Sequence, residues 1–165
     1  MNLEVLLLKK EAEHIENLAS RMTGNLDFFE LIYEKGNNFE VPNIMTYSSV
    51  IDDHHSVTQW KGKADVVGKD YVIDLKTTSS IDDFKWNARK YNYDSQAFIY
   101  RRLFGKPMMF LVIEKQTGRM GMFTGNEDFY IRGQEKMHRA IDVYQKFFSE
   151  EKILDINNYY VKGEI

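Results

Sequence analysis

The sequence predicts an α/β sandwich built around a mixed β-sheet of about five strands, with helices flanking the sheet. Two observations lead to this fold class. The expected elements follow one another as helix, three strands, helix, two strands and helix, which is neither a strict βαβ alternation nor an all-β pattern. Residues 108–114 form an almost uninterrupted apolar run, typical of a strand buried on both faces. With 165 residues, 43% of them apolar and 14% aromatic, the chain can build one domain with a real core.

The N-terminal part of the chain is expected to be helical. Apolar residues recur at three- and four-residue spacing over residues 15–22 and again over residues 28–33. Gly24-Asn25 interrupts the pattern, and residues 35–38 end it. The apolar positions are Ile15, Leu18, Ala19, Met22, Phe28, Phe29, Ile32 and Tyr33.

Residues 44–51, 57–67 and 71–76 are expected to form three consecutive antiparallel strands. These segments are rich in β-branched and aromatic residues, and two polar segments that resemble turns, residues 52–55 and 68–70, separate them. Strands joined by such short turns pair with their sequence neighbours, so this part of the chain predicts a meander.

One long helix is expected over residues 81–104, because Gly105 and Pro107 supply a stop signal after it. Strands at 108–114 and 120–124 follow. A last helix is expected to begin after Asn126, which is suited to cap its first turn. The apolar positions expected to be buried on this helix are Met137, Ala140, Ile141, Tyr144 and Phe148.

Composition excludes several classes of protein. No run of eighteen or more apolar residues is present, so no membrane span is expected. The apolar stretch at residues 3–8 is too short, and too soon followed by charges, for a secretory signal. The absence of cysteine excludes disulfides, iron–sulfur clusters and thiolate zinc sites. A cytoplasmic location fits this composition.

The net charge of −3 is unusual for a protein that grips DNA. A DNA site on such a protein requires unevenly placed basic residues. The alternative is that each basic residue is a solvated charge on a helix face. The basic residues that could form a local positive surface are Lys61, Lys63, Lys85, Arg89, Lys90, Arg101, Arg102 and Lys106.

Two acidic residues and a lysine form the most informative motif. Asp65 lies near the end of one expected strand, and Asp74 and Lys76 share one face of the next strand because they are two residues apart. Both carboxylates and the Leu75 carbonyl would provide the oxygen ligands that Mg²⁺ prefers. Lys76 could orient or deprotonate the attacking water, or stabilise charge on a phosphate. The alternative is a solvated strand face with a cross-strand ion pair.

A second group of polar residues lies on the following expected helix. Tyr93, Gln96 and Tyr100 stand at relative positions 0, +3 and +7, which is one continuous helix face. A helix packed beside the Asp74–Lys76 strand could direct Gln96 at the metal site and place the tyrosines along a substrate groove. The alternative is that both tyrosines are core residues and Gln96 fills a buried polar gap.

Residues 62–65, residues 74–78 and the helical motif of residues 93–100 together resemble the RecE-type, lambda-exonuclease-like branch of the PD-(D/E)XK nucleases, and the resemblance extends over residues 36–150. It implies a restriction-endonuclease-like, three-layer core. It further implies one nuclease domain over residues 1–165, with a helical part at 1–38, a catalytic core at 39–150 and a peripheral tail at 151–165.

The resemblance also implies roles for individual residues. Asp65, Asp74 and the Leu75 carbonyl would bind Mg²⁺, with Mn²⁺ as a substitute, and Lys76 and Gln96 would be catalytic. Many relatives have a further acidic or histidine ligand on an early helix. Glu40 is the preferred candidate here, ahead of Glu30 and Asp27. Adjacent histidines at 54 and 55 are expected in an exposed turn rather than in a metal site. Expected substrate-binding residues are Lys63, Trp86, Arg89, Lys90, Tyr93 and Tyr100.

Relatives in this branch are 5′-to-3′ exonucleases that act on double-stranded DNA ends, often encoded by phages beside a strand-annealing protein and often assembled as rings. The resemblance therefore implies a DNA exonuclease in the cytoplasm of a bacterial host, with homo-oligomers and an annealing partner. Two alternatives stay open: an endonuclease with the same chemistry, and an inactive DNA- or protein-binding module with the same fold. The region before residue 36 is shorter than in longer relatives, which leaves open a compact, truncated or partner-dependent chain.

Overall fold

The computed structural model describes residues 9–51, 54–150, 154–155 and 162–164. The apolar stretch at 3–8, the centre of the expected turn at 52–53 and most of the tail expected at 151–165 therefore lie outside the described residues. Among the described helices, none combines the length and apolarity needed to cross a bilayer. The elements are α1 (Lys9–Gly24), α2 (Leu26–Tyr33), β1 (Asn38–Ile51), β2 (His54–Val67), β3 (Val72–Thr78), α3 (Phe84–Lys90), α4 (Tyr93–Phe104), β4 (Met108–Glu114), β5 (Met120–Thr124) and α5 (Glu127–Phe147).

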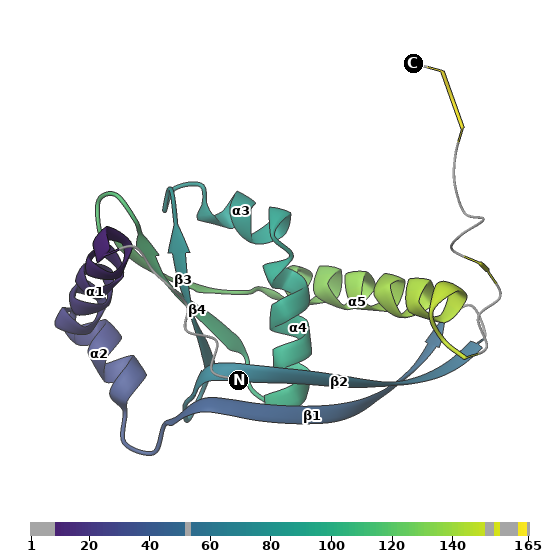
Figure 1. The fold of residues 1–165 in the computed structure, drawn as a ribbon. Coiled ribbons are helices and arrows are strands. Elements are labelled where there is room, and N and C mark those ends of the chain that lie inside the picture. Colours follow the sequence, from purple (N-terminus) through teal and green to yellow (C-terminus); the bar gives the residue numbers. More distant parts are fainter. Residues whose placement is uncertain (1–8, 52–53, 151–153, 156–161, 165) are drawn as a thin grey trace.

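The five described strands form one mixed sheet in the order β1-β2-β3-β4-β5 (Figure 1). β1, β2 and β3 pair antiparallel, as the expected meander requires, and β5 pairs antiparallel with β4. β3 and β4 are parallel, because the chain crosses over through α3 and α4 before it re-enters the sheet. The prediction of a mixed five-stranded sheet is confirmed.

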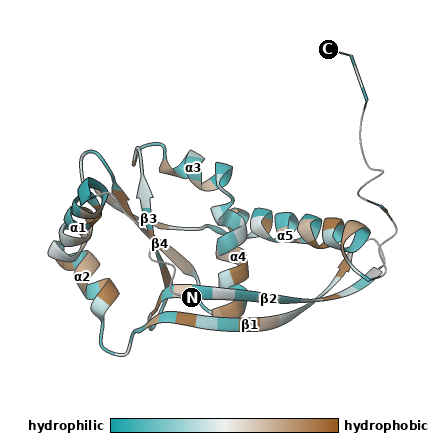
Figure 2. Ribbon diagram, viewed as in Figure 1, coloured by the Kyte–Doolittle hydropathy of each residue, from teal (hydrophilic) through white to brown (hydrophobic). Residues whose placement is uncertain are grey.

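β4 lies between the two helical layers, and all seven of its residues are buried. Its residues Met109, Leu111 and Ile113 face one core cluster with α1 and α2, whereas Met108, Phe110 and Val112 face another with α3, α4 and α5. This alternation gives three layers, with helices on both faces of the sheet. Figure 2 shows α1 mainly in hydrophilic colours, in keeping with the two residues that it buries.

The expected helix at 81–104 is divided in two, which corrects the prediction of one long helix. α3 ends at Lys90, and Asn92 adopts a left-handed conformation with φ of 58° before α4 begins at Tyr93. Asparagine tolerates this conformation better than most residues, so its position marks the break. The predicted end of α4 is confirmed, since Gly105 is its C-cap with φ of 71°.

Two further predictions are wrong. His54 and His55 belong to β2, because β1 and β2 remain paired up to Ile51 and His54 and leave a connection of two residues. On α5, Ala140 is exposed and Tyr144 is 53% exposed, and Phe148, the C-cap of the helix, is 57% exposed. Met137 and Ile141 are the members of this predicted stripe that face the core cluster with Tyr47. Asn126 does cap α5 as expected, accepting a hydrogen bond from the Phe129 N–H at 3.0 Å. The residues buried on α5 are Tyr130, Gly133, Met137 and Ile141.

Candidate active site

β2 and β3 separate shortly after the turn that joins them. They are paired only through Val66–Ile73 and Val67–Val72, and the β1–β2 hairpin then continues beneath α4 (Figure 1). Asp65 is the first β2 residue beyond this pairing. Its Oδ2 accepts a hydrogen bond from the Leu75 N–H at 2.9 Å, so a carboxylate satisfies the backbone donor where the strands part.

Asp74 projects from β3 into contact with α4. It is 6% exposed, and its Oδ1 accepts a hydrogen bond from Gln96 Nε2 at 2.6 Å. Lys76 Nζ lies 2.7 Å from Asp74 Oδ2 in an ion pair. One carboxylate therefore connects an ammonium on its own strand with an amide on the neighbouring helix.

Burial is the main influence on the pKa of Asp74, and it raises that pKa above the ordinary value because a charged carboxylate loses solvation there. Lys76 lowers the pKa of Asp74, whereas the negative charge of Asp65 raises it and the hydrogen bond from Gln96 lowers it. The negative charge of Asp65 on β2 thus disfavours the ionised form of Asp74. A cation between them would relieve both their repulsion and the desolvation cost.

Tyr93 fixes the other side of Lys76. The Lys76 ammonium lies 5.0 Å from the ring centroid of Tyr93, a cation–π contact. That ring in turn stacks on Phe110 of β4 at 5.6 Å. Lys76 is thus held between a carboxylate and an aromatic face. An ammonium has three donors, so it retains hydrogen-bonding capacity towards a substrate.

Glu40 and Lys63 form an ion pair beside Asp65. Glu40 has φ of 54°, in a region that non-glycine residues seldom adopt, and it lies opposite Asp65 where the β1–β2 pairing is interrupted. The pKa of Lys63 is raised, mainly by its hydrogen bond with Glu40 and also by the charge of Asp65. The Tyr100 hydroxyl donates to the Lys63 carbonyl at 2.9 Å, which attaches α4 to this end of the site.

The available oxygen atoms fit a hard divalent cation. Asp74 Oδ2 is buried without a well-aligned hydrogen-bond donor, and a carboxylate such as Asp65 has lone pairs beyond the one that Leu75 engages. Within the described ranges, no three or more Asp, Glu or His side chains gather into a metal-binding group. Two carboxylates with water as the remaining ligands suit Mg²⁺, which usually retains several waters.

Backbone alternation along β3 directs the Leu75 carbonyl to the same region. Val72 and Thr78 bond to the β4 side, through Val72 N–H to Pro107 O and Lys115 N–H to Thr78 O, both 2.9 Å. Successive residues of a strand turn their backbone N–H and C=O groups to opposite sides, and Leu75 is three residues from both Val72 and Thr78. The Leu75 N–H accordingly points away from β4 and donates to Asp65. The N–H and C=O of one strand residue point the same way, so the Leu75 carbonyl also faces the opening between β2 and β3.

Three residues predicted to bind substrate lie on α3, apart from this group. Trp86 is 70% exposed, with Arg89 5.6 Å from its ring, and Lys90 is exposed at the end of the helix. Among the described residues, none of the three contacts Asp65, Asp74 or Lys76. Glu30 and Asp27 are exposed on α2, the helix that packs on the other face of the sheet.

Sequence reasoning missed a buried ion pair that holds α4. Asp94 is fully buried, and Lys136 of α5 lies 2.8 Å from each of its carboxylate oxygens. Lys136 Nζ also donates to the Arg89 carbonyl at 3.3 Å, at the end of α3. This pair is next to Tyr93 and fixes the start of α4 relative to both neighbouring helices. The feature of the sequence that could have indicated this pair is the acidic residue inside the Tyr93–Tyr100 motif.

Comparison with solved structures places this architecture among known folds. A crystal structure described as "Putative exonuclease" from Eubacterium rectale is 20% identical, with a TM-score of 0.70, over 96% of this chain and 64% of that protein. The chain therefore spans somewhat under two thirds of that protein's length. The likeness shows the restriction-endonuclease-like α/β fold. A second structure, described as SSO0001, is 20% identical over 79% of this chain and 59% of that one, with a TM-score of 0.43.

No curated protein matches the chain. One family model does match it, over residues 7–153, and the family is described as "PDDEXK-like domain of unknown function (DUF3799)". The match includes every element of the sheet and the helix that carries Gln96. By this match over most of its length, the chain belongs to the PDDEXK-like family DUF3799, within the PD-(D/E)XK nuclease superfamily.

Proposed function

We propose that this protein is a magnesium-dependent DNA nuclease that hydrolyses phosphodiester bonds, and that it acts as an exonuclease on double-stranded ends. Membership of a PDDEXK-like family supports a nuclease. The single observation that carries the proposal is the geometry at Asp74, whose two oxygens contact Gln96 at 2.6 Å and Lys76 at 2.7 Å, with Asp65 adjoining on β2.

Hydrolysis requires a water oxygen to attack phosphorus while the bond to the leaving oxygen breaks, and negative charge accumulates on the phosphate oxygens. The Lys76 ammonium, fixed by Asp74 and the Tyr93 ring, can donate to the water or to a phosphate oxygen with little reorganisation. Gln96 acts through Asp74, since its hydrogen bond sets the orientation of the carboxylate.

Asp65, Asp74 and the Leu75 carbonyl would hold Mg²⁺, or Mn²⁺ in its place. When bound, the cation supplies Lewis-acid polarisation of the phosphate. We assign Glu40 a supporting role, since it pairs with Lys63 beside Asp65 and could contribute to the same cation through water.

The proposal extends to the setting implied by the RecE-type motif. We propose 5′-to-3′ polarity, a ring-shaped homo-oligomer around DNA, a strand-annealing partner and a role in phage-type recombination in the cytoplasm of a bacterial host. The motif that supports this extension is the combination of Asp65, Asp74, Lys76 and Gln96 with the tyrosines of α4.

Digestion of end-labelled linear duplex and covalently closed circular DNA, with and without Mg²⁺, tests the proposal. Wild-type protein should release the 5′ label from linear DNA as mononucleotide, only with Mg²⁺, and leave circles intact. Lys76→Ala should lower the rate by about 10²–10³-fold, the usual cost of removing one stabilising donor.

Lys69→Ala, at an exposed lysine in the β2–β3 turn, is the matched control and should leave the rate unchanged. Undiminished digestion by Lys76→Ala would contradict the assigned site. Cleavage of circles would replace the exonuclease with an endonuclease that uses the same residues.

A further inference from the structure

A polar pocket of about 290 Å³ adjoins the candidate active site. It lies between the end of β3, the start of the segment after β4 and the junction of α3 and α4. Tyr93 belongs to both places, because its ring lines the pocket and also contacts the Lys76 ammonium at 5.0 Å. A DNA strand with its scissile phosphate at Lys76 would therefore place a neighbouring nucleotide at this pocket.

Polar hydrogen-bonding side chains and one cationic side chain line the pocket beside three aromatic residues, and the polar part suits a phosphate. The hydroxyl residues Thr77 and Ser79, the amide of Asn87 and the exposed Lys115 line it, and none of its described lining residues is Asp or Glu. Lys115 is positioned by its backbone, since its N–H donates to the Thr78 carbonyl at 2.9 Å. Charge-assisted hydrogen bonds from such groups are the usual means of holding a phosphate.

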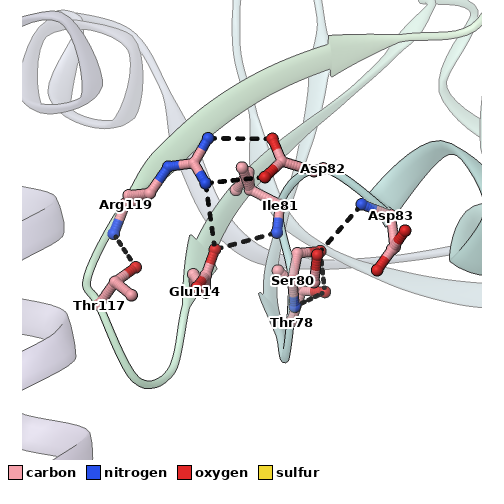
Figure 3. A network of polar contacts seen from close by, with 8 residues as sticks. All are labelled: Thr78, Ser80, Ile81, Asp82, Asp83, Glu114, Thr117 and Arg119. Atoms are coloured by element: carbon pink, nitrogen blue, oxygen red, sulfur yellow. Dashed lines mark hydrogen bonds and ion pairs between the residues drawn. The ribbon is translucent and has the colours of Figure 1, made fainter.

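Two of the acidic residues nearby, Asp82 and Glu114, lie against Arg119 (Figure 3). Arg119 forms two hydrogen bonds with Asp82, at 2.9 and 3.0 Å, and lies 4.0 Å from Glu114. Glu114 is 8% exposed and accepts a hydrogen bond from the Ile81 N–H at 3.1 Å. The charge of Glu114 is thereby offset by Arg119 and the Ile81 N–H, and Lys115 is the charged residue among those described as lining the pocket.

Hydrogen bonds of the same network connect the residues of the loop after β3. The Thr78 hydroxyl donates to the Ser80 carbonyl at 2.9 Å, and the Ser80 hydroxyl accepts from the Asp83 N–H at 3.2 Å (Figure 3). Thr78 lines the pocket together with Thr77 and Ser79, but its hydroxyl is used within the loop. A site formed in advance loses less entropy when it binds a ligand.

An aromatic ring completes the pocket. The left-handed conformation of Asn92 brings Tyr91 and Tyr93 together, with ring centroids 6.1 Å apart. Tyr93 is covered by Phe110, whereas Tyr91 is 58% exposed at the pocket. The ammonium of the exposed Lys90 lies 5.7 Å from the Tyr91 ring. An exposed ring beside a lysine and hydrogen-bond donors is an arrangement suited to holding an unpaired nucleotide by stacking.

We propose that this pocket binds one unpaired deoxynucleotide of the cleaved strand, with its phosphate at Lys115 and its base on Tyr91. The inference rests on the proposed nuclease function, because that function places DNA at the neighbouring Lys76. The product that the nuclease releases, a deoxynucleoside 5′-monophosphate, should therefore bind in this pocket even without metal.

Calorimetric titration with thymidine 5′-monophosphate in EDTA tests the proposal on the whole chain. Tyr91→Ala should weaken binding by about five-fold or more, which corresponds to the loss of one base stack. Lys115→Ala should weaken it by about ten-fold or more, because a hydrogen bond to a charged group is removed. Tyr144→Ala and Lys69→Ala, at exposed residues elsewhere, are the matched controls and should bind as the wild type does.

Equal affinity of the wild type and all variants would overturn the pocket assignment, as would equal affinity for inorganic phosphate and the nucleotide. The same preparations should be assayed for Mg²⁺-dependent digestion of linear duplex. Digestion by wild type without any difference in nucleotide binding refutes the pocket alone. Nucleotide binding that depends on Tyr91 and Lys115, without any digestion, refutes the nuclease and leaves the pocket.

Discussion

At Asp74 the chain places a carboxylate in a position that is only 6% exposed. Lys76 and Gln96 offset part of the desolvation, yet the pKa of Asp74 stays above its ordinary value of 3.8. Removing solvent from a charge in this way reduces the stability of the folded protein. Active sites commonly contain such groups, because binding and catalysis need charges that water does not neutralise.

Asp74→Asn is therefore expected to stabilise the protein at neutral pH. The folded protein binds the Asp74 proton more tightly than the unfolded chain, so its stability falls as the pH rises from 3.8 through the raised pKa. Each kcal/mol recovered at pH 7 should raise the Tm by about 2–4 °C for a chain of this size. Thermal unfolding against pH should show the gain disappearing as the pH falls to 3.8.

Asp82→Asn is the matched control, because Arg119 holds the pKa of Asp82 below its ordinary value and the variant should gain no stability.

Mg²⁺ at a hundred times its Kd should stabilise the wild type by about 2.7 kcal/mol and leave Asp74→Asn unchanged. A cation-induced rise in the Tm of Asp74→Asn equal to that of the wild type would contradict the metal assignment.

Among the elements, α4 has the decisive position, since it carries Tyr93, Gln96 and Tyr100. It is held against α5 at Gly133, where an added Cβ would lie 2.1 Å from the Asp94 carbonyl oxygen. Only glycine permits this close approach. The approach also brings Lys136 to Asp94 at 2.8 Å, which adds a buried ion pair to the contact between the two helices.

Lys136→Ala is expected to destabilise the protein by up to about 3–5 kcal/mol, because it removes the nearer of the two cations that pair with the buried Asp94 carboxylate and leaves Arg132, whose Nε lies 3.9 Å from Asp94 Oδ2. Asp94→Asn/Lys136→Ala should recover much of that loss, since the remaining amide carries no charge. Urea denaturation of the wild type, both single variants and the double variant would measure the coupling energy. A cost for the double variant equal to the sum of the two single costs would show that the pair is not coupled.

For the molecule as a whole, the charge distribution matters more than the net charge of −3. Lys85, Arg89 and Lys90 are exposed on α3, on the sheet face where Gln96 contacts Asp74. α1 and α2 cover the opposite face. A DNA duplex at the candidate site would therefore contact the basic side of α3, and this side would supply the salt-sensitive part of its affinity.

Neutralising all three α3 charges to alanine should reduce the slope of log affinity against log salt by about 0.9 for each lost phosphate contact, roughly 2–3 in total. Fluorescence anisotropy with a labelled duplex in Ca²⁺ buffer measures the slope without digestion. Lys9→Ala/Lys10→Ala, at the start of α1, should leave it unchanged. An unaltered slope in the α3 variant would remove α3 from the DNA surface.

The sequence by itself determined most of the local structure. The apolar run at 108–114 specified a buried strand, Gly105 ended α4 and Asn126 began α5. Spacing alone placed Asp74 and Lys76 on one strand, two residues apart, and assigned Gln96 to a helix. Such features depend on propensity, capping and periodicity, which act over a few neighbouring residues.

Only the tertiary structure decided how these elements form a site. The early separation of β2 and β3 turned Asp65 towards Leu75, and packing of α4 buried Asp74 beneath Gln96. The ion pair of Asp94 with Lys136 joins residues 42 positions apart. Desolvation, strand separation and long-range ion pairs depend on which distant surfaces pack together. Local sequence patterns do not determine which surfaces those are.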